Sequence, residues 1–87
     1  MRIRPHRRKL YADAKDVLTN ETAIKIFNYA KEYIYVPAEA IRRLGLTQKQ
    51  YYTNLRRLMD AGLIERNRGS YHHTKLGTSW YKRLNES

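Results

Sequence analysis

The side chains with the clearest chemistry lie in the stretch from Thr47 to Met59, whose thirteen positions contain no acidic residue. The stretch combines amides, hydroxyls and cations, which are the groups that donate hydrogen bonds to base edges and phosphate oxygens. A solvated helix face would ordinarily mix glutamate with lysine, so this pattern favours contact with a polyanion. The residues expected to contact DNA here are Thr47, Gln48, Lys49, Gln50, Tyr52, Thr53, Arg56 and Arg57.

The expected chemistry differs along this stretch. Gln48 and Gln50 can bond bidentately to adenine, Lys49 can donate to guanine, and the methyl group of Thr53 suits a thymine methyl. Arg56 and its neighbour lie further along and are expected to meet phosphates. The pattern therefore predicts base contacts at the start of the stretch and backbone contacts towards its end.

A second basic cluster follows in the segment Arg66-Asn67-Arg68-Gly69-Ser70. Asparagine and glycine between two β-prone segments, 63–66 and 70–74, are typical of a hairpin turn. Arginines on a projecting turn can enter a narrow minor groove or hold phosphates. We therefore expect Arg66, Arg68 and Ser70 to contact DNA beside the first stretch.

The first nine residues form a third basic segment, interrupted by Pro5. One interpretation is a solvated terminus, and the other is an arm that lies along phosphates or in a minor groove. The residues that would make such contacts are Arg2, Arg4, Arg7, Arg8 and Lys9.

Composition limits the possible partners. The chain has 87 residues, with 18 Lys and Arg against 8 Asp and Glu, which gives a formal net charge of +10. This length predicts one domain over residues 10–87 after the basic arm at residues 1–9. So basic a domain favours nucleic acid as its partner, ahead of an anionic membrane surface or a merely solubilising charge.

Other function classes are disfavoured. The sequence has no cysteine, its eight acids are dispersed, and it has no phosphate-binding glycine loop, so we expect neither an enzyme nor a metal or other cofactor. His72 and His73 are adjacent, so on a strand they point to opposite faces and cannot chelate together. No apolar run approaches the roughly 20 residues of a membrane span. We expect a cytoplasmic protein with no membrane partner and no evident small-molecule effector.

Hydrophobic spacing predicts the elements that carry these residues. A first helix is expected over about residues 6–18, and a second one is capped by Thr19 or Asn20. The buried stripe of the second helix is Ala23, Ile26, Phe27, Ala30 and Ile34. The β-formers Tyr35 and Val36 precede a short helix over residues 38–44, which Gly45 ends.

The next helix, residues 47–61, is the one expected to recognise DNA. Thr47 with Gln50 three positions later is a capping-box pattern, and Gly62 supplies the stop. Its expected buried stripe is Tyr51, Leu55, Leu58 and Met59. Two helices joined by a short glycine-containing turn are typical of a helix-turn-helix.

A last helix, residues 75–85, has an aromatic face. Because two half-sites generally give the specificity that one recognition helix lacks, a homodimer is expected. The predicted dimer contacts are Leu76, Trp80, Tyr81 and Leu84. The competing interpretation is that Trp80 closes the core of its own chain, and both can hold.

Residues 17–77 resemble the winged helix-turn-helix regulators, especially compact archaeal and ArsR-type ones. The matching segments are VLTN before Ile26-Phe27, AIRRLGLT at 40–47, YTNLRRL at 52–58, DAGLI at 60–64 and YHHTKLG at 71–77. The resemblance implies a mainly α fold with a small β-wing, in the order α-α-(β)-α-α-β-β-α. It also implies a homodimeric transcriptional regulator, of archaeal or archaeal-virus origin, that binds double-stranded DNA.

The sequence departs from that family at His73, where an aliphatic residue is usual. This imidazole must face solvent or find a hydrogen-bond partner. Two alternatives to sequence-specific regulation stay open: a non-specific architectural or RNA-binding protein, and a winged-helix adaptor that binds other proteins.

Overall fold

The computed structural model describes residues 14–86, so the predicted arm at residues 1–9 and the start of the first predicted helix lie outside the described residues. The described part is mainly helical with one small antiparallel sheet, which confirms the expected fold class at that level. After a helical segment at residues 14–17, the elements are α2 (Glu21–Tyr29), the 3-10 turn η1 (Ala30–Glu32), α3 (Pro37–Leu44), α4 (Gln48–Asp60), β1 (Ile64–Asn67), β2 (Ser70–His73) and α5 (Lys75–Asn85).

The helices begin and end at the residues that local chemistry favours. The Asn20 side chain accepts the Ala23 amide at 3.1 Å and caps α2. At the start of α4, the hydroxyl of Thr47 accepts the Gln50 amide at 3.0 Å, while the Gln50 side chain accepts the Thr47 amide at 2.9 Å. Gly45 ends α3 in the left-handed region. The predicted capping box and glycine stop are both confirmed.

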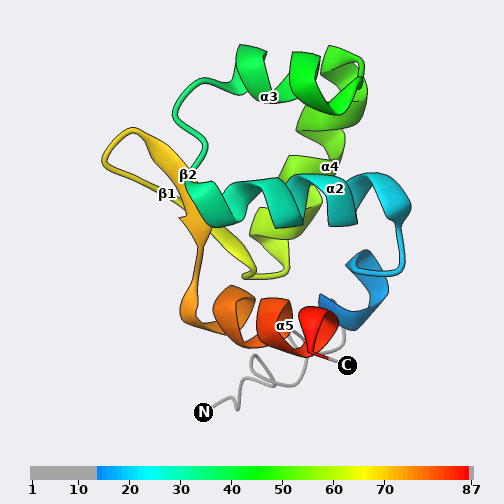
Figure 1. The fold of residues 1–87 in the computed structure, drawn as a ribbon, viewed down its shortest axis with the longest axis vertical. Coiled ribbons are helices and arrows are strands. Elements are labelled where there is room, and N and C mark those ends of the chain that lie inside the picture. Colours follow the sequence, from blue (N-terminus) through cyan, green and yellow to red (C-terminus); the bar gives the residue numbers. More distant parts are fainter. Residues whose placement is uncertain (1–13, 87) are drawn as a thin grey trace, which may run out of the picture.

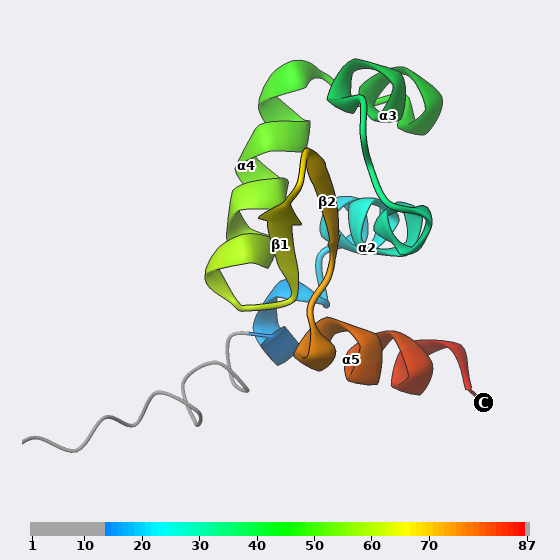
Figure 2. The same cartoon turned by 90° about the vertical axis from the view of Figure 1, so that its left-hand side faces the viewer.

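Helix α3 lies at one end of the molecule, α5 lies at the other, and α2 crosses between them (Figure 1). Helix α4 packs its buried face against α2. The hairpin β1–β2 lies beside α4 and faces the viewer in Figure 2. This arrangement leaves one long side of α4 without a covering element among residues 14–86.

The hairpin turns through two residues. Asn67 pairs with Ser70, and the two residues between them, Arg68 and Gly69, have positive φ of 52° and 79°. Positive φ at both central positions is the pattern of a type I′ turn, whose twist matches that of the strands. Turn composition alone therefore located the hairpin correctly.

A third segment joins this sheet at one residue. Ile34 exchanges backbone hydrogen bonds with Tyr71, with N···O distances of 2.8 and 2.9 Å. The predicted β segment at Tyr35 and Val36 thus lies one position too late, because these two residues are exposed and lead into α3. The pairing at Ile34 fixes the loop between α2 and α3 against β2.

The core is built largely as the spacing predicts. All five residues of the stripe predicted for the second helix are buried, as are the predicted α4 residues Tyr51, Leu55 and Leu58. The second helix is shorter than predicted, because α2 ends at Tyr29; Ala30 lies in η1, and Ile34 pairs with β2. Met59 was expected inside and is instead 37% exposed. The buried face of α4 is completed by Asn54, whose side-chain amide donates to the Gln50 carbonyl at 2.8 Å. Met59 follows Leu58 by about 100° of helix rotation, which turns it towards the hairpin.

His73 finds the partner that its position requires. Its Nε2 lies 2.7 Å from the Phe27 carbonyl oxygen and therefore donates to it, and its ring stacks on Phe27 with centroids 4.3 Å apart. Burial lowers the pKa of His73 below 6.5, the Phe27 carbonyl opposes this shift, and the charges of His72 and Lys31 add to it. The imidazole is thus a neutral core group that ties β2 to α2.

This arrangement predicts a pH dependence of stability. Because the pKa of His73 is lower in the folded chain, the unfolded chain takes up the proton first as the pH falls below about 6.5. The free energy of unfolding is therefore expected to fall as the pH drops through this range, and to recover fully above it. His73→Gln keeps a side-chain amide donor without a titrating group, so its unfolding free energy should change less. Urea unfolding at pH 7.5 and 5.5 measures both slopes, and equal slopes in the two proteins would contradict the assignment.

Candidate nucleic-acid interface

The residues expected to read DNA lie on the open side of α4. Its acid-free stretch is exposed at Gln48, Lys49, Gln50, Tyr52, Thr53, Arg56 and Arg57, with Thr47 exposed just before the helix. Lys49, Thr53 and Arg56 follow one another at spacings of four and three, so they form the middle of this face. An α-helix whose basic side stands clear of the protein body has the shape needed to enter a major groove.

The capping box reduces the set of side chains available for base contacts. The Oε1 atom of Gln50 accepts the Thr47 amide, so this amide group cannot also make a bidentate contact to adenine. The Thr47 hydroxyl is likewise occupied as the acceptor for Gln50. Gln48, Lys49 and Thr53 are then the principal candidates for base readout.

A groove of about 360 Å³ runs between α4 and the hairpin. It is lined by Tyr52, Leu55, Arg56, Met59, Asp60 and Tyr71. Tyr71 faces Arg66 across the strand pair, and the guanidinium carbon of Arg66 lies 5.8 Å from the centre of the Tyr71 ring. Cations from α4 and from β1 therefore border one groove.

Charge is uneven along this groove. Arg56 and Arg66 supply cations, whereas Asp60 places a carboxylate at the C-terminal end of α4. A phosphate would be repelled at Asp60 and attracted at the arginines. The useful part of the groove for an anion is therefore its N-terminal portion, near Tyr52 and Arg56.

Arg57 lies on the other flank of α4. It lines a separate pocket of about 140 Å³ together with Asp16, Val17, Asp60 and Ala61. Two carboxylates in that lining offset its charge locally. The structure thus separates Arg57 from the groove that Arg56 borders, although the two residues are adjacent in sequence.

At the hairpin tip, the predicted residues divide into exposed and buried ones. Arg66 and Arg68 are exposed. Ser70 was expected to contact DNA, but it is only 3% exposed, and its hydroxyl lies 3.2 Å from the Asn67 carbonyl and 3.1 Å from His72 Nδ1. Its side chain closes the turn rather than facing a ligand.

The predicted dimer face on α5 packs largely within the chain. Leu76, Trp80 and Tyr81 are partly buried against the core, and the Tyr81 ring meets Phe27 edge-on at 6.2 Å. Leu84 remains 41% exposed. Closure of the chain's own core therefore accounts for most of the aromatic face, and Leu84 is the predicted contact that stays most accessible.

The predicted DNA contacts leave out four residues of the groove lining: Leu55, Met59, Asp60 and Tyr71. The sequence predicts Leu55 and Met59 in the core and Tyr71 in a strand. The sequence feature that indicates a role for Tyr71 is its position opposite Arg66 in the predicted hairpin. No local signal distinguishes Met59 from a core residue, because it lies four positions after Leu55.

Among residues 14–86, no three His, Asp or Glu side chains are grouped closely enough to hold a metal ion. None of the helices described there combines the length and apolar character that crossing a bilayer would require. Comparisons of the chain with protein-family models, curated proteins and solved structures find no match.

Proposed function

We propose that this chain is a winged helix-turn-helix protein that binds double-stranded DNA as a transcriptional regulator. Helix α4 would enter the major groove, with α3 as the preceding helix of the motif. The β1–β2 hairpin would lie over neighbouring phosphates or the minor groove as the wing. The order of helices and hairpin, with the strand-like pairing at Ile34, supports this proposal.

One observation carries the proposal. The exposed side of α4 is free of acidic residues from Thr47 to Met59, and it faces a groove that Arg56 and Arg66 border from two different elements. In a chain of net charge +10, this places donors for base edges beside cations for the phosphate backbone. Lys49 and Arg56 supply the charge on α4, and Arg68 extends it to the hairpin tip.

Regulation would require two copies. A single helix reads few base pairs, so a homodimer that places two α4 helices about 34 Å apart would give the needed specificity. The accessible Leu84 on α5 is the proposed starting point of that contact. The expected operator is an inverted repeat.

Selection from a random double-stranded DNA pool tests this function. We expect an enriched inverted repeat, and we expect Gln48→Ala to reduce discrimination at one position of each half-site by about tenfold. Arg68→Ala should instead weaken binding to all sequences similarly, because a phosphate contact carries no sequence information. Fluorescence anisotropy with the selected and scrambled duplexes measures both effects. Equal losses on both duplexes for both variants would refute direct readout by α4.

A second function is favoured by the capping box. Because Thr47 and Gln50 are engaged in the cap, few side chains remain to read bases. This supports a non-specific nucleic-acid-binding protein that uses the same cations without sequence preference. Such a protein would enrich no motif from the pool and would bind the selected and scrambled duplexes equally.

A further inference from the structure

A small pocket lies on a different part of the surface, between the end of α2, the loop that follows it and the start of α3. Its volume is about 100 Å³, and it shares no lining residue with the groove beside α4. Its lining consists of Tyr29, Tyr33, Ile34, Tyr35, Val36 and Glu39. Figure 1 shows this loop beside the hairpin, on the side of α2 that also faces α3. Three tyrosines and one carboxylate therefore surround a space that is not part of the core.

The tyrosines are more exposed than core packing would leave them. Tyr33 is 50% exposed and Tyr35 is 65% exposed, and Val36 beside them is also exposed. The rings of Tyr33 and Tyr35 are 27° from parallel with centroids 6.3 Å apart, whereas Tyr33 lies closer to His72, with centroids 4.7 Å apart. His72 thus supports one side of Tyr33, while the exposed rings of Tyr33 and Tyr35 stay accessible to a ligand at the pocket.

The backbone at Tyr33 is strained, and the ring is too exposed for its burial to offset that strain. Its φ is 58° and its ψ is 117°, a conformation that glycine adopts far more readily than a bulky residue. Such outliers cluster at sites of function, where the surrounding structure holds them in place. Here the pairing of Ile34 with Tyr71 fixes the next residue, so the strained conformation serves to present the Tyr33 ring.

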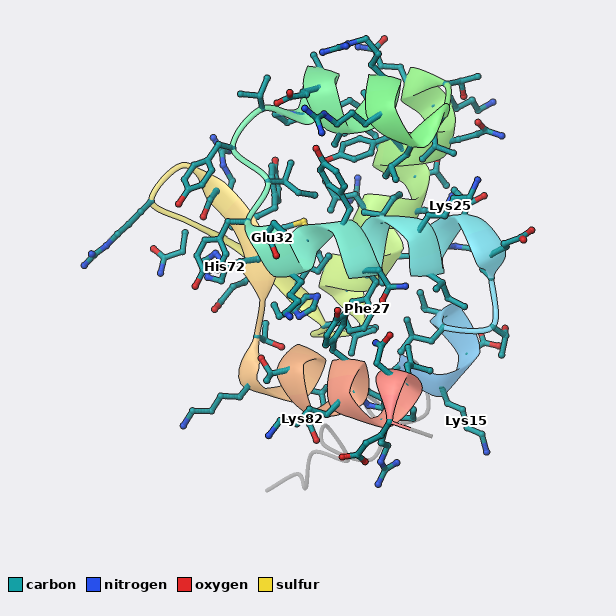
Figure 3. All side chains as sticks on the ribbon, viewed as in Figure 1. Lys15, Lys25, Phe27, Glu32, His72 and Lys82 are labelled. Atoms are coloured by element: carbon teal, nitrogen blue, oxygen red, sulfur yellow. The ribbon has the colours of Figure 1, made fainter. Side chains whose placement is uncertain are left out.

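Acidic side chains lie at and near this pocket, in a protein whose net charge is positive. Glu39 lines it, Glu65 lies 3.4 Å from the His72 ring that supports Tyr33, and Glu32 directly precedes Tyr33 (Figure 3 labels Glu32 and His72). These are three of the eight acidic residues of the chain. Aromatic faces and carboxylates together attract a cation, while the same carboxylates disfavour a phosphate-bearing nucleotide.

We propose that this pocket binds the guanidinium group of an arginine side chain presented by a partner protein. A planar guanidinium can stack on the tyrosine rings and donate to the carboxylate in one pose, which a compact ammonium cannot do. Glu39 is the acceptor. Arg43 on the next turn of α3 already pairs with its Oε2 atom at 3.2 Å, so an arriving guanidinium would share this carboxylate with Arg43. The pocket gives the protein a second surface for contact with other proteins, independent of the DNA-binding function proposed above.

The test uses N-acetyl-arginine amide as the probe and N-acetyl-citrulline amide, its uncharged isostere, as the control ligand. Nuclear magnetic resonance spectra of the full chain should show saturable shifts for residues 29–39 with the arginine compound. The citrulline compound should cause none. Equal shifts with both compounds would overturn the proposal. So would stronger shifts of these residues with thymidine monophosphate, because they would identify a base-stacking surface.

Variants separate binding from folding. Tyr33→Gly removes the ring and relieves the positive φ, so it should fold at least as stably as the original while binding the probe about fivefold more weakly. Tyr35→Ala and Glu39→Gln should weaken binding by a similar factor. Tyr52→Ala removes an exposed tyrosine on α4 and should leave probe binding unchanged. Unchanged affinity in Tyr33→Gly and Glu39→Gln would overturn the assignment.

Discussion

Arg56→Glu is expected to weaken DNA binding about 100-fold at moderate salt, because it turns a phosphate contact into a repulsion. Arg56 lies in the middle of the open side of α4 and lines the groove that Arg66 borders from the hairpin. Neutralising the same residue, in Arg56→Gln, should have a smaller effect and should reduce the log–log salt slope by about one per subunit. Fluorescence anisotropy over a series of salt concentrations measures the affinity and the slope together.

A matched variant separates this local effect from a change in overall charge. Lys82→Glu makes the same change in net charge on α5, away from α3 and from the hairpin tip (Figure 3). Its side chain is exposed, as that of Arg56 is. We expect it to weaken binding by only about threefold, through long-range repulsion that salt screens. If both reversals reduce affinity equally, α4 is not the DNA-contacting surface.

Gly77→Ala is expected to destabilise the fold by about 3 kcal/mol, because one added methyl group would overlap the backbone of a neighbouring element. A Cβ at Gly77 would overlap the backbone carbonyl oxygen of Leu63 and lie 3.3 Å from the His73 Cβ. Helix α5 cannot easily move away, because Thr74 anchors its start. The Thr74 amide donates to that same Leu63 carbonyl at 3.1 Å, and its hydroxyl accepts the Gly77 amide at 2.9 Å.

Gly69→Ala is the control for this substitution. A Cβ at Gly69 would meet no atom within 4 Å, so only the φ of 79° at this residue opposes the substitution. The expected cost is about 1 kcal/mol. Urea unfolding followed by circular dichroism compares the two variants. A smaller loss of unfolding free energy in Gly77→Ala than in Gly69→Ala would show that α5 does not pack closely on Leu63.

Features set by neighbours along the chain could be predicted from the sequence. The capping box at Thr47 and Gln50, the left-handed stop at Gly45 and the location of the hairpin turn each depend on contacts within four positions. The buried positions Ala23, Ile26 and Phe27 of α2 follow from helical spacing for the same reason. The acid-free side of α4 could also be predicted, because the residues outside the apolar stripe of a helix form its exposed face.

The tertiary structure decided what these local patterns leave open. Ser70 is buried where its hydroxyl bonds Asn67 and His72, Met59 is exposed beside the groove, and Arg57 lines a pocket with residues 16 and 17 instead of the groove. The fold stacks Tyr33 on His72, a residue that no sequence spacing connects to it. Short-range geometry determines which helices and turns form. Which residues line the same groove or pocket depends on the packing of segments that are distant in sequence, and hydrophobic periodicity does not encode that packing.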